Sequence, residues 1–395
     1  MTTFQCPGFV AGAIEAGIKY PNRKDVGLLF SIVPAHAAGV FTTNRIKAAP
    51  VLLDMELIRN GKARAVIVNS GNANCFTGEQ GEKDAIMTCR ATANALQIPW
   101  EEVLVSSTGV IGNPMPMDVL LPAIPKLVAN LKKDGFMDLA QAMMTTDIVP
   151  KVVQKTIILQ NIPVTLVGVA KGAGMIRPDM ATMLSYIVTD AYIPPTLLKK
   201  MLLKVVNQTY NRITIDGDTS TNDTVFLLAN GVSNVSIRTG SLEEKQFQFA
   251  LYELCQELSH MLIKDGEGAT KVVELIVKGT ATQKDAQKIA ETIAHSPLVK
   301  TAFFGEDANW GRIIAAAGRL HVLFDPQKID LFFDDIAVIQ QGRFLGKEVE
   351  SAATQVLKTN EFTVTLDFHM GSCGYGMLTC DFSVEYVKIN ADYRT

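Results

Sequence analysis

The sequence predicts a mixed α/β protein of the α+β class, in which sheets pack against helices and a second, smaller α+β domain lies toward the C-terminus. The chain has 395 residues, of which 48% are hydrophobic and 19% charged, so it can bury a large core divided between two domains. Apolar runs of strand length recur along it, and amphipathic helical patterns separate some of them. These runs lack the strict βαβ alternation of a doubly wound parallel sheet.

The predicted strands are short apolar runs rich in β-branched residues. They lie at Val26–Val33, Ala65–Asn69, Val103–Ser107, Val152–Leu159, Pro163–Val169, Leu184–Thr189, Thr224–Leu228 and Val272–Val277. The predicted helices repeat apolar residues with the helical period. They lie at Glu82–Leu96, Pro116–Lys132, Pro195–Gln208 and Leu242–Lys264.

A hydrophilic segment, Gly279–Asp285, marks the border between the two predicted domains. After it, a helix at Ala286–His295, a second helix near Asn309–Gly318 and short strands indicate the smaller domain. The sequence therefore predicts a division into residues 1–281 and 282–395.

The charge pattern favours small soluble ligands and a cytoplasmic location. The net charge is −3, and no run of five like charges offers a surface for nucleic acid or for a membrane. Met1–Pro7 has no basic region followed by an apolar stretch, and no run of 18 apolar residues occurs elsewhere.

The cysteines predict neither a redox motif nor a metal site. The chain has six, which are scattered and form no C-x-x-C pair, so we expect reduced thiols. His369 and Cys373, four residues apart, come nearest to a ligand pair. Because two residues without further ligands do not make a site, we expect them to serve packing and expect no bound metal.

The segment Lys171–Asp190 contains the strongest candidate for a catalytic nucleophile. A glycine-rich loop leads to Ala181 and Thr182, and an apolar β-rich run follows at once. If the bond between them were cut, Thr182 would carry both a hydroxyl and a free α-amine. The amine has a reference pKa of roughly 7.7 to 8, so near neutral pH it can accept the proton of its own hydroxyl. Such a nucleophile needs no catalytic histidine.

Two loops offer supporting groups. In Ser106–Gly112, the Thr108 hydroxyl and the Gly109 N–H could hold a developing oxyanion, although most Thr-Gly pairs at strand ends are simply turns. Gly168–Gly174 matches neither of the glycine patterns of nucleotide-binding proteins, so a tight loop near a cleavage point is the better interpretation. Its Lys171 either neutralises a substrate carboxylate or is a solvated surface lysine.

Three further polar segments allow a structural or a functional interpretation. Asp216–Asp223 lacks the glycine and glutamate of a calcium loop, so it is either an ordinary polar turn or a turn lining a site. Glu267 stands between two glycines, where it either belongs to a turn or pairs with a substrate ammonium. Asn309 begins a helical stretch and is best interpreted as its N-cap.

Taken together, these segments resemble the glutamate N-acetyltransferase family of arginine biosynthesis, also called ornithine acetyltransferase, whose members activate themselves by cleaving before a threonine. The resemblance runs nearly end to end, through short motifs whose number and order make chance an implausible explanation. The motifs are Ala38–Asn44, Asn69–Asn74, Ser107–Gly112, Met144–Asp147, Lys171–Ile176, Ala181–Leu184, Asp216–Asp223, Gly266–Lys271, Asn309–Arg312 and Ile389–Tyr393.

The resemblance implies roles for individual residues. Thr182 would be the nucleophile and Ala181–Thr182 the cleaved bond, giving an α chain of residues 1–181 and a β chain of residues 182–395. Thr108 and Gly109 would form the oxyanion hole. The residues that contact substrate would be Thr145, Lys171, Thr182, Glu267, Asn390 and Thr395. Thr145 is preferred over Thr146 because of its spacing to Lys171.

The resemblance also implies a fold and a reaction. The catalytic domain would be similar to those of N-terminal-nucleophile enzymes. Thr182 would take the acetyl group from N-acetylornithine, release ornithine, and pass the acetyl group to glutamate to form N-acetylglutamate. No metal or organic cofactor is implied, and acetyl-CoA would be a substrate only in a bifunctional member. Two α and two β chains would form a heterotetramer.

Other hypotheses remain open at this level. The chain could be a related N-terminal-nucleophile aminopeptidase or amidase, in which water replaces glutamate as the acceptor. It could also be an inactive self-cleaving scaffold or a metabolite-binding module. No residue decides between enzymes that only recycle acetyl groups and those that also use acetyl-CoA.

Overall fold

The computed structural model describes residues 3–177 and 183–392 of the chain. The chain divides into two compact units. Unit 1 comprises Met1–Asn211 and Asp218–Leu262, and unit 2 comprises Arg212–Gly217 and Ile263–Thr395. The predicted domain limits, 1–281 and 282–395, and the predicted chains, 1–181 and 182–395, remain predictions.

Unit 1 contains two sheets. The strands of the first, in spatial order, are β1 (Phe9–Ile14), β2 (Val26–Ser31), β4 (Ala65–Asn72) and β5 (Val103–Val110). The strands of the second are β3 (His36–Phe41), β10 (Thr224–Ala229), β8 (Leu184–Thr189), β7 (Ile162–Lys171) and β6 (Lys151–Leu159). Each sheet contains one parallel pair, β4 with β5 and β10 with β8, and its other neighbours are antiparallel.

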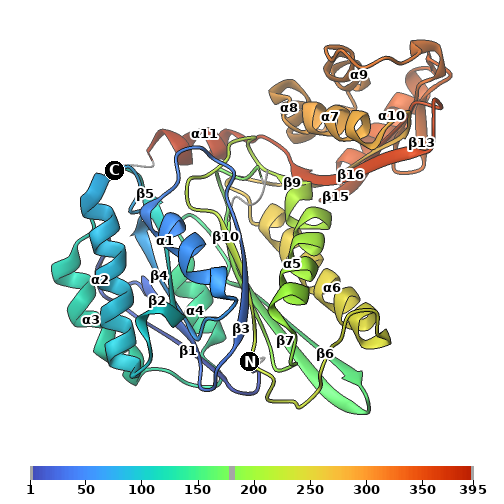
Figure 1. Ribbon diagram of the computed structural model, residues 1–395. Coiled ribbons are helices and arrows are strands. Elements are labelled where there is room, and N and C mark those ends of the chain that lie inside the picture. Colours follow the sequence, from blue (N-terminus) through green and yellow to red (C-terminus); the bar gives the residue numbers. More distant parts are fainter. Residues whose placement is uncertain (1–2, 178–182, 393–395) are drawn as a thin grey trace. The chain divides into compact units, whose positions relative to one another are not determined.

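The two sheets face each other across a shared core, and helices cover their outer faces. The helices of unit 1 are α1 (Ala49–Leu57), α2 (Gly78–Leu96), α3 (Met117–Ala129), α4 (Phe136–Met143), α5 (Pro195–Gln208) and most of α6 (Leu242–Lys264). Figure 1 shows α2 and α3 on one side of the sheets and α5 and α6 on the other. Helix α4 contributes Phe136 and Leu139 to the core between the sheets.

The alternation of side chains along β4 explains this layering. Val66 and Val68 belong to the core between the sheets, whereas Ala65 and Ile67 pack with residues of α2 and α3. Successive residues of a strand point to opposite faces, so a strand that is apolar at every position is buried on both sides. On the other sheet, a side chain at Gly168 of β7 would meet Leu254 of α6, which shows how closely that helix lies against the sheet.

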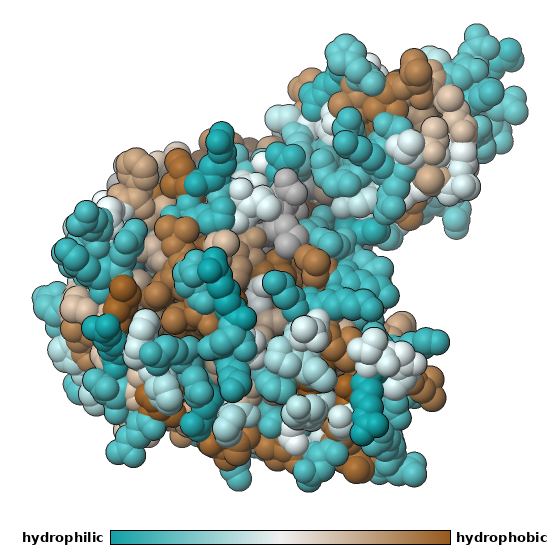
Figure 2. Space-filling model, viewed as in Figure 1, coloured by the Kyte–Doolittle hydropathy of each residue, from teal (hydrophilic) through white to brown (hydrophobic). Residues whose placement is uncertain are grey.

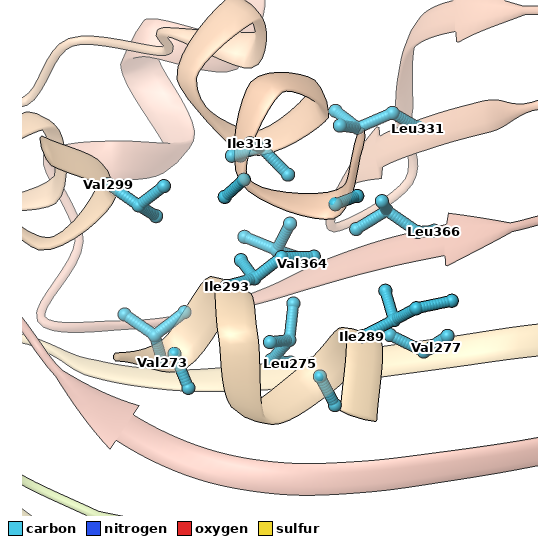
Figure 3. Packing of buried hydrophobic residues seen from close by; sticks show 14 of the residues in the cluster. Val273, Leu275, Val277, Ile289, Ile293, Val299, Ile313, Leu331, Val364 and Leu366 are labelled. Carbon is cyan, nitrogen blue, oxygen red and sulfur yellow. The ribbon is translucent and has the colours of Figure 1, made fainter. Parts of the chain in front are cut away.

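Unit 2 is built on one mixed sheet. Its strands, in spatial order, are β14 (Arg343–Phe344), β13 (Ile336–Gln340), β12 (Asp330–Phe333), β15 (Glu361–Asp367), β11 (Val272–Thr280), β16 (Cys373–Cys380) and β9 (Ile213–Thr214). Its helices are α7 (Gln283–Ala294), α8 (Pro297–Phe304), α9 (Trp310–Gly318), α10 (Lys347–Leu357) and α11 (Val384–Ala391). In Figure 3, Ile289 and Ile293 of α7 point toward Val277 and Val364 of the sheet, which forms an apolar core belonging to unit 2.

The predicted fold class is confirmed, since both units combine sheets with packed helices. Asn309 is the N-cap of α9, because its side chain accepts a hydrogen bond from the backbone N–H of Arg312. Polar and apolar side chains are mixed over the visible surface of unit 1, and apolar ones gather over α1, where Leu52 and Met55 are exposed (Figure 2). No helix among residues 3–177 and 183–392 is long and apolar enough to cross a membrane.

Candidate functional site

The end of β5 places Thr108 and Gly109 against the neighbouring strand β4. Gly109 has φ 135°, and a Cβ atom there would lie 2.3 Å from the carbonyl carbon of Gly71 and 2.5 Å from the backbone nitrogen of Asn72. The register shifts at this point, because Asn72 pairs with both Thr108 and Val110. Only glycine allows so close an approach of two backbones, so this position is fixed by geometry.

Buried asparagines hold this strand end in place. The Ser107 hydroxyl donates to Oδ1 of Asn69 (2.7 Å), and Nδ2 of Asn69 donates to the carbonyl of Asn72 (2.9 Å). Nδ2 of Asn222, which lies just before β10, donates to the carbonyls of Ser107 (2.8 Å) and Ala73 (2.6 Å). Asn69 therefore fixes β4 against β5, and Asn222, which binds two backbone carbonyls at once, ties the two sheets together beside Thr108.

Lys171, the last residue of β7, contacts two other predicted site residues of unit 1. Its side chain is only 9% exposed, which excludes the interpretation as a solvated surface lysine. Its ammonium donates to Oγ1 of Thr145 (2.9 Å) and, over a longer distance, to Oγ1 of Thr108 (3.4 Å). An ammonium only donates hydrogen bonds, so both hydroxyls act as acceptors here and keep their own hydrogens for another acceptor.

The register of the second sheet brings further groups to the same edge. Lys171 pairs with Leu184 of β8, and Leu184 pairs with Thr224 of β10. Met183 and Asp223, which precede these two strands, therefore lie at the strand ends beside Lys171.

Asp147 is a buried carboxylate that the sequence interpretation did not single out. It accepts hydrogen bonds from the backbone N–H groups of Thr145 (3.1 Å) and Gly172 (2.6 Å) and from Nζ of Lys151 (2.9 Å), and Nζ of Lys171 lies 3.9 Å away. Burial alone would raise the pKa of Asp147, but the charges of Lys171 and Lys151 and these hydrogen bonds hold it well below its usual range. In the sequence, the indication that Asp147 belongs to the site was its position two residues after the predicted substrate contact Thr145.

Asp223 is a second buried carboxyl group, and its environment shifts the pKa in the opposite direction to that of Asp147. Burial raises its pKa well above the usual range, against smaller lowering contributions from a hydrogen bond with Ser220 and from the charge of Lys171. Its Oδ2 atom has no hydrogen-bond partner among the described residues. Its place at the end of the polar segment Asp216–Asp223 favours the interpretation of that segment as a turn that lines a site.

In unit 2, the predicted residues Glu267 and Asn390 form a pair. Nδ2 of Asn390, in α11, donates to Oε2 of the buried Glu267 (2.8 Å) and to the carbonyl of Tyr386 (3.0 Å). A Cβ atom at Gly268 would lie 2.5 Å from the backbone nitrogen of Tyr386 and 2.6 Å from Oγ of Ser383, the N-cap of α11. The glycine that follows Glu267 therefore lets the helix pack directly on its loop.

A buried carboxylate also fixes the other side of this loop. Asp381 accepts hydrogen bonds from the N–H (2.8 Å) and hydroxyl (2.6 Å) of Thr270 and from the N–H of Lys271 (2.9 Å). Nζ of Lys271 contacts Oε1 of Glu306 (2.9 Å). The carboxylate of Glu267 thus sits on a loop whose backbone is held from both ends.

The remaining predicted residues, Ala181, Thr182 and Thr395, lie outside the described residues, so the cleaved bond and the nucleophile remain predictions. His369 contacts Oδ2 of Asp330 through its Nε2 atom (2.8 Å). All six cysteines are free thiols. Within residues 3–177 and 183–392, no group of three or more His, Cys, Asp or Glu side chains is placed to hold a metal ion.

The arrangement in unit 1 is suited to stabilising negative charge that develops on an oxygen atom. A hydroxyl at Thr108, a second hydroxyl at Thr145 and the ammonium of Lys171 meet at one sheet edge. Donors that are fixed in advance lower the energy of a tetrahedral oxyanion more effectively than mobile water does.

Comparison with known proteins identifies the family. The ArgJ family model matches residues 10–395. A protein of Desulfotalea psychrophila called "Arginine biosynthesis bifunctional protein ArgJ" is 48% identical over 389 residues, covering 98% of this chain and 99% of that protein. A protein of the same name from Thermotoga neapolitana is 45% identical over 395 residues, with 98% and 99% coverage.

Two solved structures are similar to parts of the chain. One is the arginine biosynthesis bifunctional protein argJ of Bacillus halodurans, at 42% identity and a TM-score of 0.43, covering 45% of this chain and 92% of that one. The other is the ornithine acetyltransferase of Mycobacterium tuberculosis complexed with ornithine, at 40% identity and a TM-score of 0.41, covering 45% and 94%.

We expect Gly109→Ala to lower the free energy of unfolding more than Gly112→Ala does. Both glycines have positive φ, 135° and 91°, but only at Gly109 would the new methyl group meet backbone atoms. Backbone strain costs about 1–2 kcal/mol at either position, and the overlap at Gly109 adds roughly 1–3 kcal/mol. Chemical denaturation of the two variants measures the difference, and equal losses would contradict the close approach of β4 and β5.

We expect Asp223→Asn to flatten the dependence of stability on pH. The folded state raises the pKa of Asp223, so its contribution to stability is complete below the unfolded pKa of about 3.9 and is lost as the pH rises toward the folded value. Asparagine stays neutral, so the variant should gain stability relative to the parent as pH increases. Denaturation across a pH series tests this, with the exposed Asp335→Asn as control. Parallel curves for parent and variant would contradict it.

Proposed function

The chain belongs to the ArgJ family, and we propose that it is a self-processing acetyltransferase of arginine biosynthesis that moves the acetyl group from N2-acetylornithine to glutamate. The observation that supports this most directly is the sheet edge of unit 1. There the hydroxyls of Thr108 and Thr145 contact the ammonium of Lys171, and Lys171 pairs with Leu184, which follows Thr182 by two residues in the sequence. Acyl transfer by Thr182 needs such a group of donors beside it.

In the first step, the α-amine of Thr182 takes the proton of its own hydroxyl, and Oγ1 attacks the acetyl carbonyl of N2-acetylornithine. Thr108 and Gly109 donate to the oxyanion that forms. When the intermediate collapses, the bond from the acetyl carbon to nitrogen breaks, and the Thr182 ammonium returns the proton to the leaving amine. The products of this step are ornithine and an acetyl ester of Thr182.

In the second step, the neutral amine of glutamate attacks the acetyl ester, and the α-amine of Thr182 accepts the excess proton. The same oxyanion donors serve this intermediate, since the carbonyl of the ester replaces that of the amide. Collapse restores the threonine hydroxyl and releases N-acetylglutamate. The hydroxyl proton of Thr182 leaves with ornithine, and a proton from the glutamate amine replaces it, so the cycle balances and we propose that it uses no metal and no organic cofactor.

We propose that Thr145, Lys171, Glu267, Asn390 and Thr395 contact the amino-acid part of the substrates, together with Thr182. The ammonium of Lys171 suits a substrate carboxylate, and the carboxylate of Glu267 suits an α-ammonium. The contact between Glu267 and Asn390 supports this assignment, because it leaves the second carboxylate oxygen of Glu267 to bind a ligand.

We further propose that acetyl-CoA serves as a second acetyl donor, since curated relatives over nearly the whole chain carry the name "bifunctional". We also propose that two copies of each fragment assemble into a heterotetramer in the cytoplasm. None of these proposals requires nucleic acid or a membrane.

We expect Thr182→Ala to give a protein that is not cleaved and does not transfer acetyl groups, because both steps need the threonine hydroxyl. Thr182→Ser keeps a hydroxyl and, after cleavage, an α-amine, so it should still be cut. Intact-mass measurement of the purified proteins, followed by an assay with N2-acetylornithine and glutamate, tests both statements. Normal transfer by the alanine variant would refute the mechanism, and hydrolysis without transfer to glutamate would favour the amidase interpretation.

We expect the unmodified protein to form N-acetylglutamate from glutamate and acetyl-CoA when N2-acetylornithine is omitted. Acetyl-CoA would load Thr182 with the same acetyl group, so Thr182→Ala should abolish this activity as well. Product analysis by mass spectrometry measures it. If only N2-acetylornithine supports product formation, the enzyme recycles acetyl groups and is not bifunctional.

A further inference from the structure

We propose that Asp147 and Lys151 form a buried positioning pair that holds Thr145, Gly172 and Lys171 in the geometry needed for acetyl transfer. This inference rests on the proposed function, since it assigns a role to two residues outside the set expected to contact substrate. Both side chains are completely buried, and Oδ1 of Asp147 lies 2.9 Å from Nζ of Lys151.

The carboxylate of Asp147 connects two separate pieces of the site. Its Oδ2 atom accepts from the N–H of Thr145 (3.1 Å), and its Oδ1 atom accepts from the N–H of Gly172 (2.6 Å). Thr145 follows α4, whereas Gly172 begins the loop that leads from β7 toward the predicted cleavage point. One side chain therefore sets the distance between a predicted substrate contact and that loop.

The guanidinium of Arg23 binds two carbonyl groups of the same turn. Nη2 of Arg23 donates to the carbonyl of Thr145 (3.0 Å) and to that of Met144. The N–H of Thr145 is thus bound by Asp147 and its C=O by Arg23. Because both backbone polar groups of Thr145 are hydrogen-bonded, its backbone is held in place before substrate binds. A catalytic or binding group that is held in this way needs no rearrangement during the reaction.

The charges explain why the pair contains a lysine. Asp147 lies within 3.9 Å of the ammonium of Lys171, and without another cation this attraction would draw Lys171 away from Thr145 and Thr108. Lys151 supplies a second ammonium at 2.9 Å, on the other oxygen atom. The carboxylate is then satisfied mainly by Lys151 and the two N–H groups, and Lys171 remains bonded to the hydroxyls.

Two variants separate positioning from simple stabilisation. Asp147→Asn leaves the buried ammonium of Lys151 without its counter-charge, so we expect a lower unfolding temperature and at least a tenfold lower kcat. The double variant Asp147→Asn with Lys151→Met removes both charges and should recover most of the stability, but it lacks the second acceptor oxygen that lets one side chain hold the N–H groups of both Thr145 and Gly172. Its kcat should remain at least tenfold below the parent, because a displacement of ~1 Å can cost about 100-fold in rate.

The matched control is Lys155→Met, on the same strand as Lys151. Lys155 pairs with Glu257 at 2.8 Å, but both side chains are partly exposed, so both stability and kcat should change little. In every protein, intact mass gives the cleaved fraction and kcat is calculated per cleaved molecule. A slower self-cleavage in the Asp147 variants also supports the inference, because Asp147 holds Gly172.

A double variant that is stable, cleaved and within twofold of the parent kcat would overturn the inference. If the double variant does not fold, Asp147→Glu decides, because it keeps the charge and moves the carboxylate by one methylene group. Parental kcat in a folded Asp147→Glu protein would overturn the inference, and a tenfold loss would support it. Absence of transfer by the parent protein would instead refute the proposed function.

Discussion

The geometry of the site depends on keeping the ammonium of Lys171 charged where it is nearly buried. Such a charge is costly unless carboxylates and hydrogen-bond acceptors surround it. Here Asp147 supplies the carboxylate, and Thr145 and Thr108 supply the acceptors. Thr108 lies at the end of β5, Thr145 and Asp147 lie in the turn after α4, and Lys171 ends β7. The hydrogen bonds and charge interactions of this one ammonium therefore hold the three segments together.

The two facing sheets make this meeting possible. Gly109 lets β5 approach β4 so closely that the strand end cannot move sideways, and Asn222 ties that end to β10 of the other sheet. The register of β7, β8 and β10 then sets Lys171 beside Met183 and Asp223. Residues on strand ends of a packed core are held more precisely than residues on free loops, which suits a reaction that tolerates little displacement.

Much of the fold could be predicted from the sequence, but only where the local pattern agreed with the final structure. Helices α5 and α6 have the predicted bounds because their apolar residues recur with helical spacing, and strand β8 has them because it is a continuous run of buried residues. Strand β3 was not predicted, since its Ala37, Ala38 and Gly39 have low strand propensity and pairing with β10 decides its conformation. Helix α4 was not predicted because it has only eight residues, too few for the helical period to be evident in the sequence. For the site, the motifs indicated Thr108, Thr145 and Lys171. The carboxyl groups around the lysine are distant from it in sequence, so apart from the position of Asp147 two residues after Thr145, the local pattern did not show that Asp147 or Asp223 would be its neighbours.

The opposite treatment of these two carboxyl groups sets the charge of the site. Hydrogen bonds and two ammonium groups stabilise the ionised form of Asp147, whereas burial favours the neutral form of Asp223. If both were ionised, the charges of Lys151 and Lys171 would be cancelled. The shift of Asp223 toward its neutral form leaves more of the positive charge of Lys151 and Lys171 uncancelled. That charge lies beside the hydroxyls of Thr108 and Thr145, where it favours a substrate carboxylate and an oxyanion that develops on the acetyl carbonyl. Burying Asp223 without a hydrogen-bond partner at Oδ2 costs stability. The same burial disfavours its negative charge, which helps to keep the potential at the site positive for acyl transfer.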